Sequence, residues 1–402
     1  MKTNVGVFFG GRSVEHEISV LSALQAIAAM DKEKYDIIPI YITKKGHWLT
    51  GDALLDINNY KNLDSLEAKA TEVYMRPVYG DYNLYPVRRK GFFTKSDAPL
   101  AQLHVALPVL HGTNGEDGIF EGVLETIGIP FAGCNTLSSA NGMDKITMKM
   151  ILRSEGIPVV DYVWFTDKQW LSDRDAIVER VEKELGYPVI VKPANLGSSV
   201  GIGKASDREQ LIAKIDNAEK FSQRLIVEHC IDRLKEINCS VLGDVDDHQS
   251  SVCEEPIKSG DFLSYEDKYM GGTKTESGMQ ASAKRIPAEL PDEVSEKIRH
   301  MAAETFRVLG CHGVSRIDVM IDEADGNIYV NEINTIPGSL SFYLWEATGI
   351  TFPQLMDRLV QLAIRRKRDT DRKTFTYSHN IFAMKGGLKG GAKGGLKGGM
   401  KK

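Results

Sequence analysis

Residues 189–204, VIVKPANLGSSVGIGK, constrain the fold more than any other stretch of the chain. A P-loop requires a glycine, four residues and then Gly-Lys-Ser/Thr at the start of a helix. Here five residues separate Gly197 from Gly203, and Ala205 follows Lys204 where the P-loop has a hydroxyl. The sequence after the glycines predicts a short strand before the next helix. The segment therefore predicts a strand–loop–strand hairpin and excludes a P-loop.

The first third of the chain alternates between apolar strands and helices. Residues 4–9, 35–42 and 103–110 are apolar runs typical of strands that are buried on both faces. Residues 118–128 predict a helix that ends at Gly128. This order predicts an open α/β sheet, in which ligands gather at the carboxyl ends of the strands.

The middle of the chain has a different pattern. Residues 138–156 predict one helix with an apolar face. Ser206 and Glu209 have the spacing of a capping box, which predicts that the next helix begins there. Residues 258–284 are polar and have no clear periodicity, and such a segment in a compact chain is usually a lid or a binding loop.

Composition excludes several classes of protein. No apolar run reaches the length of about 18 residues that a membrane span needs. The five cysteines are scattered without a C-x-x-C pair, which argues for reduced thiols in a cytoplasm and against a disulfide framework or a zinc site. Residues 385–402 form a Lys-Gly-Gly repeat with six lysines and no acid. Its low apolar content predicts disorder, and a solvated tail is favoured over contact with RNA or an anionic membrane.

A second hairpin is predicted by two alternating strands around an Asp-Gly turn, GVSRIDVMIDEADGNIYVNEIN. If the turn is centred on Asp325, Asp318 lies opposite Glu332 and Arg316 lies opposite Asn334. Two carboxylates and an amide oxygen are suitable ligands for Mg²⁺. A polar face turned to water is the simpler interpretation of one such strand. Like charges directly opposite each other are destabilising without a cation, however, and the pattern favours magnesium.

Lys192 ends the buried strand before the glycine loop. An amine in this place can bind a phosphate, and the backbone N–H groups from Gly197 to Gly201 can coordinate the phosphate oxygens. Glycines are also common in ordinary hairpin turns. The loop alone therefore leaves both interpretations open.

Two more segments follow predicted strands. Glu15 begins the first helix, where an exposed carboxylate usually only complements the helix dipole. Residues 111–122, HGTNGEDGIFEG, precede another helix, and their backbone amides form a candidate anion site. His111 by itself is more often structural.

Taken together, these motifs resemble the D-alanine–D-alanine ligases of the ATP-grasp superfamily over residues 3–375. The resemblance rests on GGRSVEHEISV, HGTNGEDGIFEG, MDK, VKPANLGSSVG, SYEDKY and GVSRIDVMI…YVNEINTIPG, in this order. It implies an α/β N-terminal open domain, residues 1–136, followed by a two-domain ATP-grasp fold of the α+β type. The implied lid domain is 137–222 and the catalytic domain is 223–380, with the disordered Lys/Gly-rich tail at 381–402.

The resemblance implies a cytoplasmic enzyme that joins two D-alanines with ATP through an acyl phosphate. The products are D-alanyl-D-alanine, which serves peptidoglycan synthesis, ADP and phosphate. ATP, two Mg²⁺ ions or Mn²⁺ in their place, and a homodimer are implied as well, and nucleic acid is not an expected partner. The alternative is a ligase whose second substrate is D-lactate or D-serine. Tyr269 stands where D-lactate-using relatives often have Phe, and it favours the dipeptide.

Site residues are implied by position within the matching motifs. The implied catalytic residues are Glu15, Ser198, Arg316, Gly338, Tyr269 and Lys268. The implied nucleotide-binding residues are Lys145, Lys192, Gly197, Ser198, Ser199, Glu228, Glu236 and Lys268. The implied metal ligands are Asp318, Glu332 and Asn334.

Within these sets the resemblance implies distinct roles. Glu15 receives the ammonium of the first D-alanine, and Ser198 links it to Tyr269. Arg316 and the backbone amide of Gly338 stabilise the oxyanion of the tetrahedral intermediate.

The carboxylate of the second substrate has two candidate partners in the implied site. The segment SLSFYLW departs here from many relatives, which have Met-Thr or Phe-Thr. Ser341 and Tyr343 both remain candidates.

Overall fold

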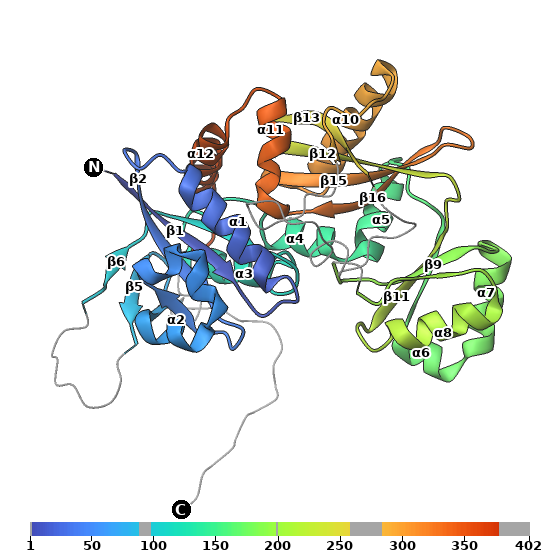
Figure 1. Ribbon diagram of the computed structural model, residues 1–402, viewed down its shortest axis with the longest axis horizontal. Coiled ribbons are helices and arrows are strands. Elements are labelled where there is room, and N and C mark those ends of the chain that lie inside the picture. Colours follow the sequence, from blue (N-terminus) through green and yellow to red (C-terminus); the bar gives the residue numbers. More distant parts are fainter. Residues whose placement is uncertain (1, 88–97, 198–199, 258–283, 378–402) are drawn as a thin grey trace, which may run out of the picture.

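The computed structural model describes residues 2–87, 98–197, 200–257 and 284–377, and its strands form three sheets. Figure 1 shows the seven-stranded sheet on the left and, on the right, the five-stranded sheet above the four-stranded sheet. Several predictions lie outside the described residues: Ser198, Ser199, Lys268, Tyr269, the tail 381–402 and, except for Lys284, the loop 258–284.

The seven-stranded sheet has the strand order β6-β5-β4-β3-β2-β1-β7. The three predicted strands are confirmed as β1, β2 and β7, and β1 runs parallel to both of the others. The antiparallel strands β3 to β6 extend the sheet beyond what the apolar runs predicted. The bounds are β1 Thr3–Gly10, β2 Tyr35–Ile42, β3 Trp48–Thr50, β4 Thr71–Met75, β5 Asn83–Pro86, β6 Ala101–Gln102, β7 Val105–Leu110, α1 His16–Ala29, η1 Asp52–Leu55, η2 Ile57–Lys61, α2 Leu63–Lys69 and α3 Ile119–Ile127.

The four-stranded sheet contains the glycine hairpin that the sequence predicted. Strands β9 and β10 pair antiparallel, with Gly203 opposite Val191, and a helix follows only after β10. The capping prediction was wrong, because the side chain of Asp207, not of Ser206, accepts the helix-start N–H of Gln210. The order is β10-β9-β11-β8. The bounds are β8 Tyr162–Thr166, β9 Val189–Pro193, β10 Gly203–Ala205, β11 Arg224–His229, α6 Asp167–Ser172, α7 Arg174–Glu184 and α8 Arg208–Ala218.

The predicted helix at 138–156 is two helices, α4 Thr136–Met143 and α5 Lys145–Ser154. Asp144 separates them, because its side chain accepts a hydrogen bond from the backbone N–H of Thr147 and so caps α5. As a result α5 begins at Lys145, and Lys149 lies one turn further along the same buried face. The spacing of four residues thus places the two lysines on the same face of α5.

The five-stranded antiparallel sheet has the order β14-β13-β12-β15-β16. The predicted pairs Arg316 with Asn334 and Asp318 with Glu332 are confirmed. Nearer the turn Val319 pairs with Val330, so Asn331 is an extra residue, a β-bulge that the sequence analysis did not predict. The bounds are β12 Leu234–Gly243, β13 His248–Pro256, β14 Lys284–Arg285, β15 Gly313–Asp322, β16 Ile328–Asn334 and, against β13, α10 Asp292–Val308.

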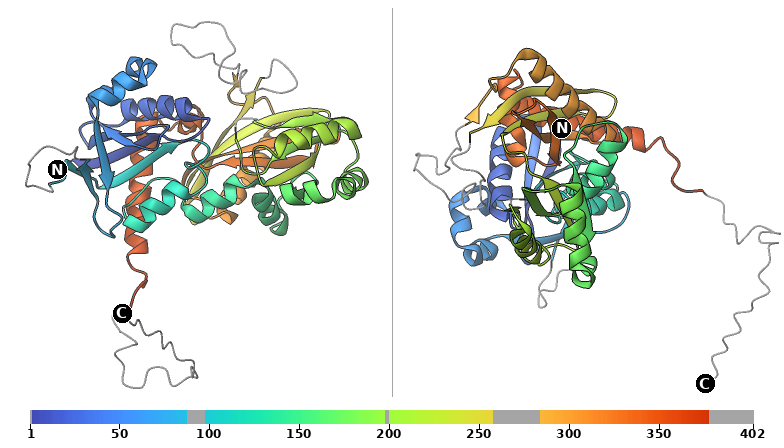
Figure 2. Two further views of the ribbon diagram at one scale, coloured as in Figure 1. Left: turned by 90° about the horizontal axis from the view of Figure 1, so that it is seen from below. Right: turned by 90° about the vertical axis from the view of Figure 1, so that its right-hand side faces the viewer.

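The C-terminal segments pack onto the first sheet. Apolar residues of β1 and α1 share one core with η3 (Gly338–Ser341), α11 (Phe342–Ala347) and α12 (Phe352–Thr370). Figure 2 shows α12 lying beside the N-terminal sheet. The imidazole of His111 joins the two parts, with Nδ1 at 2.8 Å from the carbonyl oxygen of Ile336 and Nε2 at 2.8 Å from the hydroxyl of Ser22. His111 is structural, as predicted, and burial lowers its pKa to about 4.

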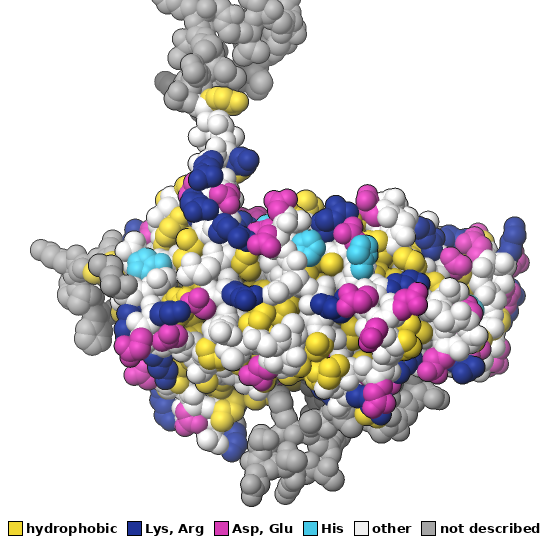
Figure 3. All heavy atoms as spheres, turned by 90° about the horizontal axis from the view of Figure 1, so that it is seen from above, with side chains coloured by type: hydrophobic (Ala, Val, Ile, Leu, Met, Phe, Trp, Pro, Cys, Tyr) yellow, Lys and Arg dark blue, Asp and Glu magenta, His cyan; other side chains and the backbone are white. Residues whose placement is uncertain are grey.

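The surface carries charges of both signs. Figure 3 shows one face on which Lys and Arg side chains alternate with Asp and Glu and with small apolar areas. A groove of about 570 Å³ between α12 and the end of β12 contains none of the predicted site residues. Among the described residues, no helix has the length and apolar character needed to cross a membrane.

Glu121 on α3 provides a test of how the N-terminal domain responds to pH. Its side chain is 2% exposed, and burial raises its pKa to about 9, with smaller contributions from Cys134 and Asp117. A pKa that is higher in the folded than in the unfolded chain means that stability is fully present below the usual value of 4.5 and is lost as the pH rises toward 9.

We expect Glu121→Gln to remove this pH dependence. Relative to the variant, the wild type should lose up to about 1.4 kcal/mol of unfolding free energy per pH unit in that window. Urea unfolding at pH 6.0 and pH 8.5 measures the difference, with Glu125→Gln, an exposed carboxylate on the same helix, as control. An equal difference at both pH values would contradict the assignment.

Candidate active site

A cavity of about 100 Å³ brings together predicted site residues that lie far apart in the sequence. It lies where the loops after β1 and β7, the start of α5, the glycine loop and the hairpin β15–β16 converge. Its polar lining includes Glu15, Glu116, Lys145, Arg316, Asp318 and Glu332. Three of these are acidic residues with a predicted role, so the cavity is a candidate active site.

Glu15 is buried in this site and is not the exposed carboxylate that a helix start usually carries. Its side chain is 9% exposed and makes no capping hydrogen bond to α1. The carboxylate lies against two glycines. A β-carbon at Gly112 would stand 2.4 Å from Oε2, and one at Gly197 would stand 3.4 Å from either oxygen. The close approach requires glycine at Gly112 and brings the glycine loop onto the N-terminal domain.

The predicted anion site at 111–122 is filled by the chain itself, so that prediction was wrong. The backbone N–H of Gly112 donates to Oε2 of Glu116 at 2.9 Å, and that of Ile336 donates to Oε1 at 3.1 Å. Burial and the neighbouring Glu15 raise the pKa of Glu116 to about 8. The segment thus holds a carboxyl group between the N-terminal and C-terminal parts.

Lys145 connects the glycine loop after β9 with the hairpin β15–β16, which carries the predicted metal ligands. Its ammonium donates to the carbonyl oxygen of Leu196 at 3.0 Å and lies 3.1 Å from Oε2 of Glu332. The backbone N–H of Lys145 also donates to the carbonyl oxygen of Ala194. An ammonium has three donors, and among the described residues two groups, Leu196 and Glu332, face that of Lys145.

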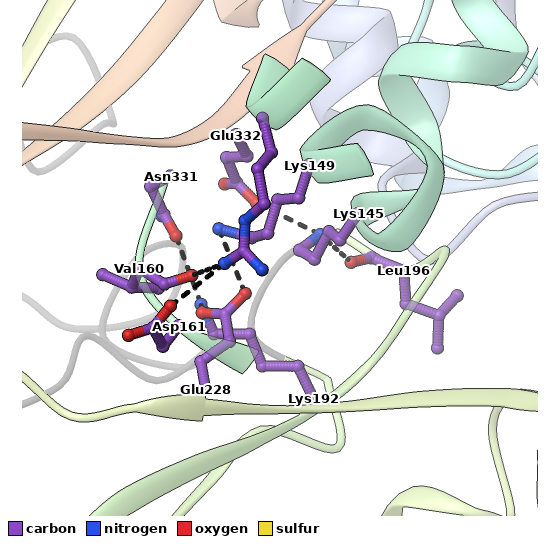
Figure 4. A network of polar contacts seen from close by, with 10 residues as sticks. Lys145, Lys149, Val160, Asp161, Lys192, Leu196, Glu228, Asn331 and Glu332 are labelled. Atoms are coloured by element: carbon purple, nitrogen blue, oxygen red, sulfur yellow. Dashed lines mark hydrogen bonds and ion pairs between the residues drawn. The ribbon is translucent and has the colours of Figure 1, made fainter. Parts of the chain in front are cut away.

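Lys192 is held in the same way, as Figure 4 shows. Its ammonium donates to Oε2 of Glu228 at 2.7 Å and to Oδ1 of Asn331 at 3.2 Å. The other oxygen of Glu228 lies 3.2 Å from the ammonium of Lys149. Glu228 is therefore enclosed between two lysines, one on β9 and one on α5.

Ion pairing shifts the pKa values of Glu228 and Lys192 in favour of their charged forms. Burial alone would raise the pKa of Glu228, but Lys149 and Lys192 lower it to about 2. Burial likewise opposes the charge of Lys192, and Glu228, Glu332 and Glu236 together raise its pKa. The predicted nucleotide residues Lys192, Glu228 and Glu236 thus form one electrostatic unit.

Arg316 and Asp318, for which separate roles were predicted, form a two-point ion pair. Nε and Nη2 of Arg316 lie 2.6 Å and 2.8 Å from the two oxygens of Asp318. Asn334 Nδ2 donates to Oδ2 of Asp318 at 3.1 Å. Glu332 lies opposite Asp318 on the next strand, so two carboxylates and the amide of Asn334 lie close together. Carboxylates and amides are residue types that Mg²⁺ takes, although here Asn334 turns its Nδ2 toward Asp318.

Gly338 begins a strained turn at the edge of the site. Three consecutive non-glycine residues, Ser339, Leu340 and Ser341, have φ angles of 51°, 52° and 52°. Such conformations cost energy and cluster at functional sites. The turn is held by the hydrogen bond from the backbone N–H of Ser339 to the hydroxyl of Ser22 at 2.9 Å.

Both candidates for the second substrate lie in or after this turn. Ser341 is fully buried, and its hydroxyl has no hydrogen-bond partner within the described part of the chain. The Tyr343 ring lies under the ammonium of Lys284, 3.9 Å from the ring centre. The choice between Ser341 and Tyr343 stays open.

Three residues of the site's polar network were missed by sequence reasoning. Lys149 had a signal, because a lysine four residues after Lys145 falls on the apolar face of its helix. Glu116 had one in the Gly-Glu-Asp sequence, which was interpreted through its amides. Asn331 had none, since only the bulge turns it toward Lys192.

Two antiparallel sheets that bring lysines onto a hairpin of carboxylates, next to an α/β domain, define an ATP-grasp ligase. Residues 4–134 match the family model described as D-ala D-ala ligase N-terminus, and residues 151–361 match the one described as D-ala D-ala ligase C-terminus. The chain belongs to the D-alanine–D-alanine ligase family.

Relatives and solved structures agree with this assignment. The chain is 40% identical over 384 residues to a D-alanine–D-alanine ligase of Thermosipho melanesiensis, which covers 96% of this chain and 99% of that protein. It is 41% identical to one of Caldicellulosiruptor bescii, over 94% of this chain and 99% of that protein.

Two solved structures share its fold. The D-alanine–D-alanine ligase of Coxiella burnetii superposes with a TM-score of 0.77 at 29% identity, over 92% of this chain and 96% of that one. The VanG D-Ala:D-Ser ligase of Enterococcus faecalis gives 0.76 at 31% identity, over 90% of this chain and 100% of that one.

Proposed function

We propose that this chain joins two D-alanines to D-alanyl-D-alanine at the expense of ATP, for peptidoglycan synthesis. The observation that carries the proposal is the convergence of Glu15, Arg316 and the Lys145–Glu332 pair on one small cavity. A carboxylate for an ammonium, a guanidinium for an oxyanion and ammoniums for phosphates are the groups that amino-acid activation by ATP requires.

In the first step a carboxylate oxygen of the first D-alanine attacks the γ-phosphorus of ATP, which gives an acyl phosphate and releases ADP. Phosphoryl transfer depends mainly on positioning and on neutralising charge. We assign the ammonium of this D-alanine to Glu15 and the phosphates to Lys145, Lys192 and the loop that begins at Gly197. The placement of both ammoniums beside the carboxylates Glu332 and Glu228 supports this assignment.

In the second step the amine of the second D-alanine attacks the acyl carbon, loses a proton, and phosphate leaves. Arg316 and the backbone N–H of Gly338 stabilise the oxyanion that forms. The ion pair with Asp318 fixes the guanidinium at two points, and Arg316 lines the cavity. The roles expected of Ser198, Lys268 and Tyr269 remain predictions.

We assign the adenine base, the ribose and the metal ions to residues next to those that bind the phosphates. Glu228 and Glu236 contact adenine and ribose. Asp318, Glu332 and Asn334 would hold two Mg²⁺ ions or Mn²⁺, which would neutralise charge on the phosphates.

Domain limits, oligomeric state and cellular compartment are also part of the proposal. The domain limits at 136, 222 and 380 stay a prediction, and strand β11 on the far side of the limit at 222 pairs within the four-stranded sheet. We propose a homodimer that acts in the cytoplasm. All five cysteines are buried and free, which supports a reducing compartment.

Steady-state release of ADP that depends on D-alanine tests the function. Product analysis with D-alanine alone, and with D-serine or D-lactate added, should give D-alanyl-D-alanine as the main product. Omission of D-alanine should reduce ADP release to background. A mixed product in which D-serine or D-lactate predominates would contradict the assignment, as would negligible dipeptide across pH 6–9.

A further inference from the structure

Lys149 is a fully buried lysine for which the proposed reaction has no role. Its side chain is 0% exposed. The distance of 3.2 Å to Oε1 of Glu228 makes an ion pair, yet Nζ has no partner with hydrogen-bond geometry among the described residues. Burial lowers the pKa of Lys149 against the opposing effect of Glu228. A buried ammonium that is incompletely paired is costly, and an apolar side chain of similar size often stabilises more.

The two ion pairs of Glu228, with Lys149 and with Lys192, are not equivalent. Lys192, which the proposed function assigns to the phosphates, is 10% exposed and already divides its donors between Glu228 and Asn331. Lys149 comes from another element, α5, and its ammonium lies by the other carboxylate oxygen of Glu228, Oε1 (Figure 4). When phosphate oxygens attract Lys192, its hold on Glu228 weakens, and Lys149 is the remaining cation in ion-pair contact with that carboxylate among the described residues.

We propose that Lys149 is a positioning residue that holds Glu228 as a fixed carboxylate while Lys192 binds phosphate, and that it thereby sets the preference for adenine. The inference rests on the proposed function, in which Glu228 contacts the base. A carboxylate only accepts hydrogen bonds, so it suits the amino group at C6 of adenine. It repels the carbonyl oxygen at C6 of hypoxanthine, whereas a protonated carboxyl group donates to that oxygen.

The test compares Lys149→Met with Lys149→Arg in the full chain, using ATP and ITP as alternative substrates. Lys149→Met should raise KM for ATP by about 10-fold, by analogy with the loss of roughly 10–100-fold when a group that orients a metal ligand is removed. The preference for ATP over ITP should fall by a similar factor. KM for D-alanine should stay within about 2-fold, and Lys149→Arg should restore most of the preference.

A double-mutant cycle with Glu228→Gln separates positioning from general destabilisation. If Lys149 acts through Glu228, Lys149→Met should have little further effect on nucleotide preference when Glu228 is already Gln. Lys214→Met, an exposed lysine on α8, is the matched control and should match the wild type.

Two results would overturn the inference. One is a lower melting temperature for Lys149→Met with unchanged KM and ATP/ITP ratio. The other is an equal effect of Lys149→Met with and without Glu228→Gln. Calorimetric titration with ADP and IDP repeats the comparison without turnover, so a failure of the proposed ligase activity is distinguished from a failure of this inference. If Lys149→Met does not fold, Lys149→Gln takes its place in the cycle.

Discussion

Replacement of Asp318 by Asn is expected to lower kcat by about 10³-fold, which is roughly 4 kcal/mol of transition-state stabilisation. The carboxylate accepts both N–H groups of Arg316 and the amide of Asn334, and it is a proposed metal ligand. The neutral amide has one acceptor oxygen in place of two. It cannot hold the guanidinium by two points, and it is a weaker ligand for Mg²⁺.

Single-turnover and steady-state ADP release measure this effect, and Asp322→Asn is the control. Asp322 ends the same strand at the exposed turn, where it accepts the backbone N–H of Ala324. The same chemical change there should leave kcat within about 2-fold. A loss below 10-fold for Asp318→Asn would show that the pair with Arg316 is structural and that the metal ligands lie elsewhere.

Replacement of Lys192 by Met is expected to lower kcat/KM for ATP by about 10²–10³-fold. Two effects combine. The phosphates lose a cation, and buried Glu228 loses the closer of its two partners, at 2.7 Å. Removal of one partner from a buried ion pair typically costs about 3–5 kcal/mol, so the thermal stability of the variant should fall as well.

Lys204→Met is the control for that prediction, since Lys204 is the lysine that resembles the P-loop residue in the sequence. Its side chain is 43% exposed and lies 4.0 Å from Asp232, outside the cavity. The variant should keep KM for ATP near the wild-type value. A large effect of Lys204→Met together with a small effect of Lys192→Met would contradict this prediction. It would show that the phosphates bind near Lys204, after the glycines, and not near Lys192.

Local patterns predicted much of this site. The period of two in a strand and the Asp-Gly turn were enough to pair Asp318 with Glu332 and Arg316 with Asn334. The absence of a helix after the glycines predicted the hairpin β9–β10. Both are properties of neighbouring residues along one or two strands, so they needed no knowledge of the rest of the chain.

Other features could be known only after folding. Asp144 has the chemistry of a helix cap, yet the continuous apolar pattern around it concealed the break between α4 and α5. The bulge at Asn331 leaves the alternation of the strand almost unchanged but turns one amide toward Lys192. Such displacements of one residue depend on which neighbours a strand or helix meets.

The sequence by itself determined the hairpins, the three buried strands of the parallel core and the residue types of the site, because these follow from periodicity and turn chemistry; the order of those strands came from the structure. Only the tertiary structure decided that Glu15 is buried against two glycines, that Glu116 fills its own anion site and that Lys149 faces Glu228. Burial and ion pairing depend on contacts between elements up to hundreds of residues apart. Those contacts convert common surface residue types into the charged interior of an ATP-grasp ligase.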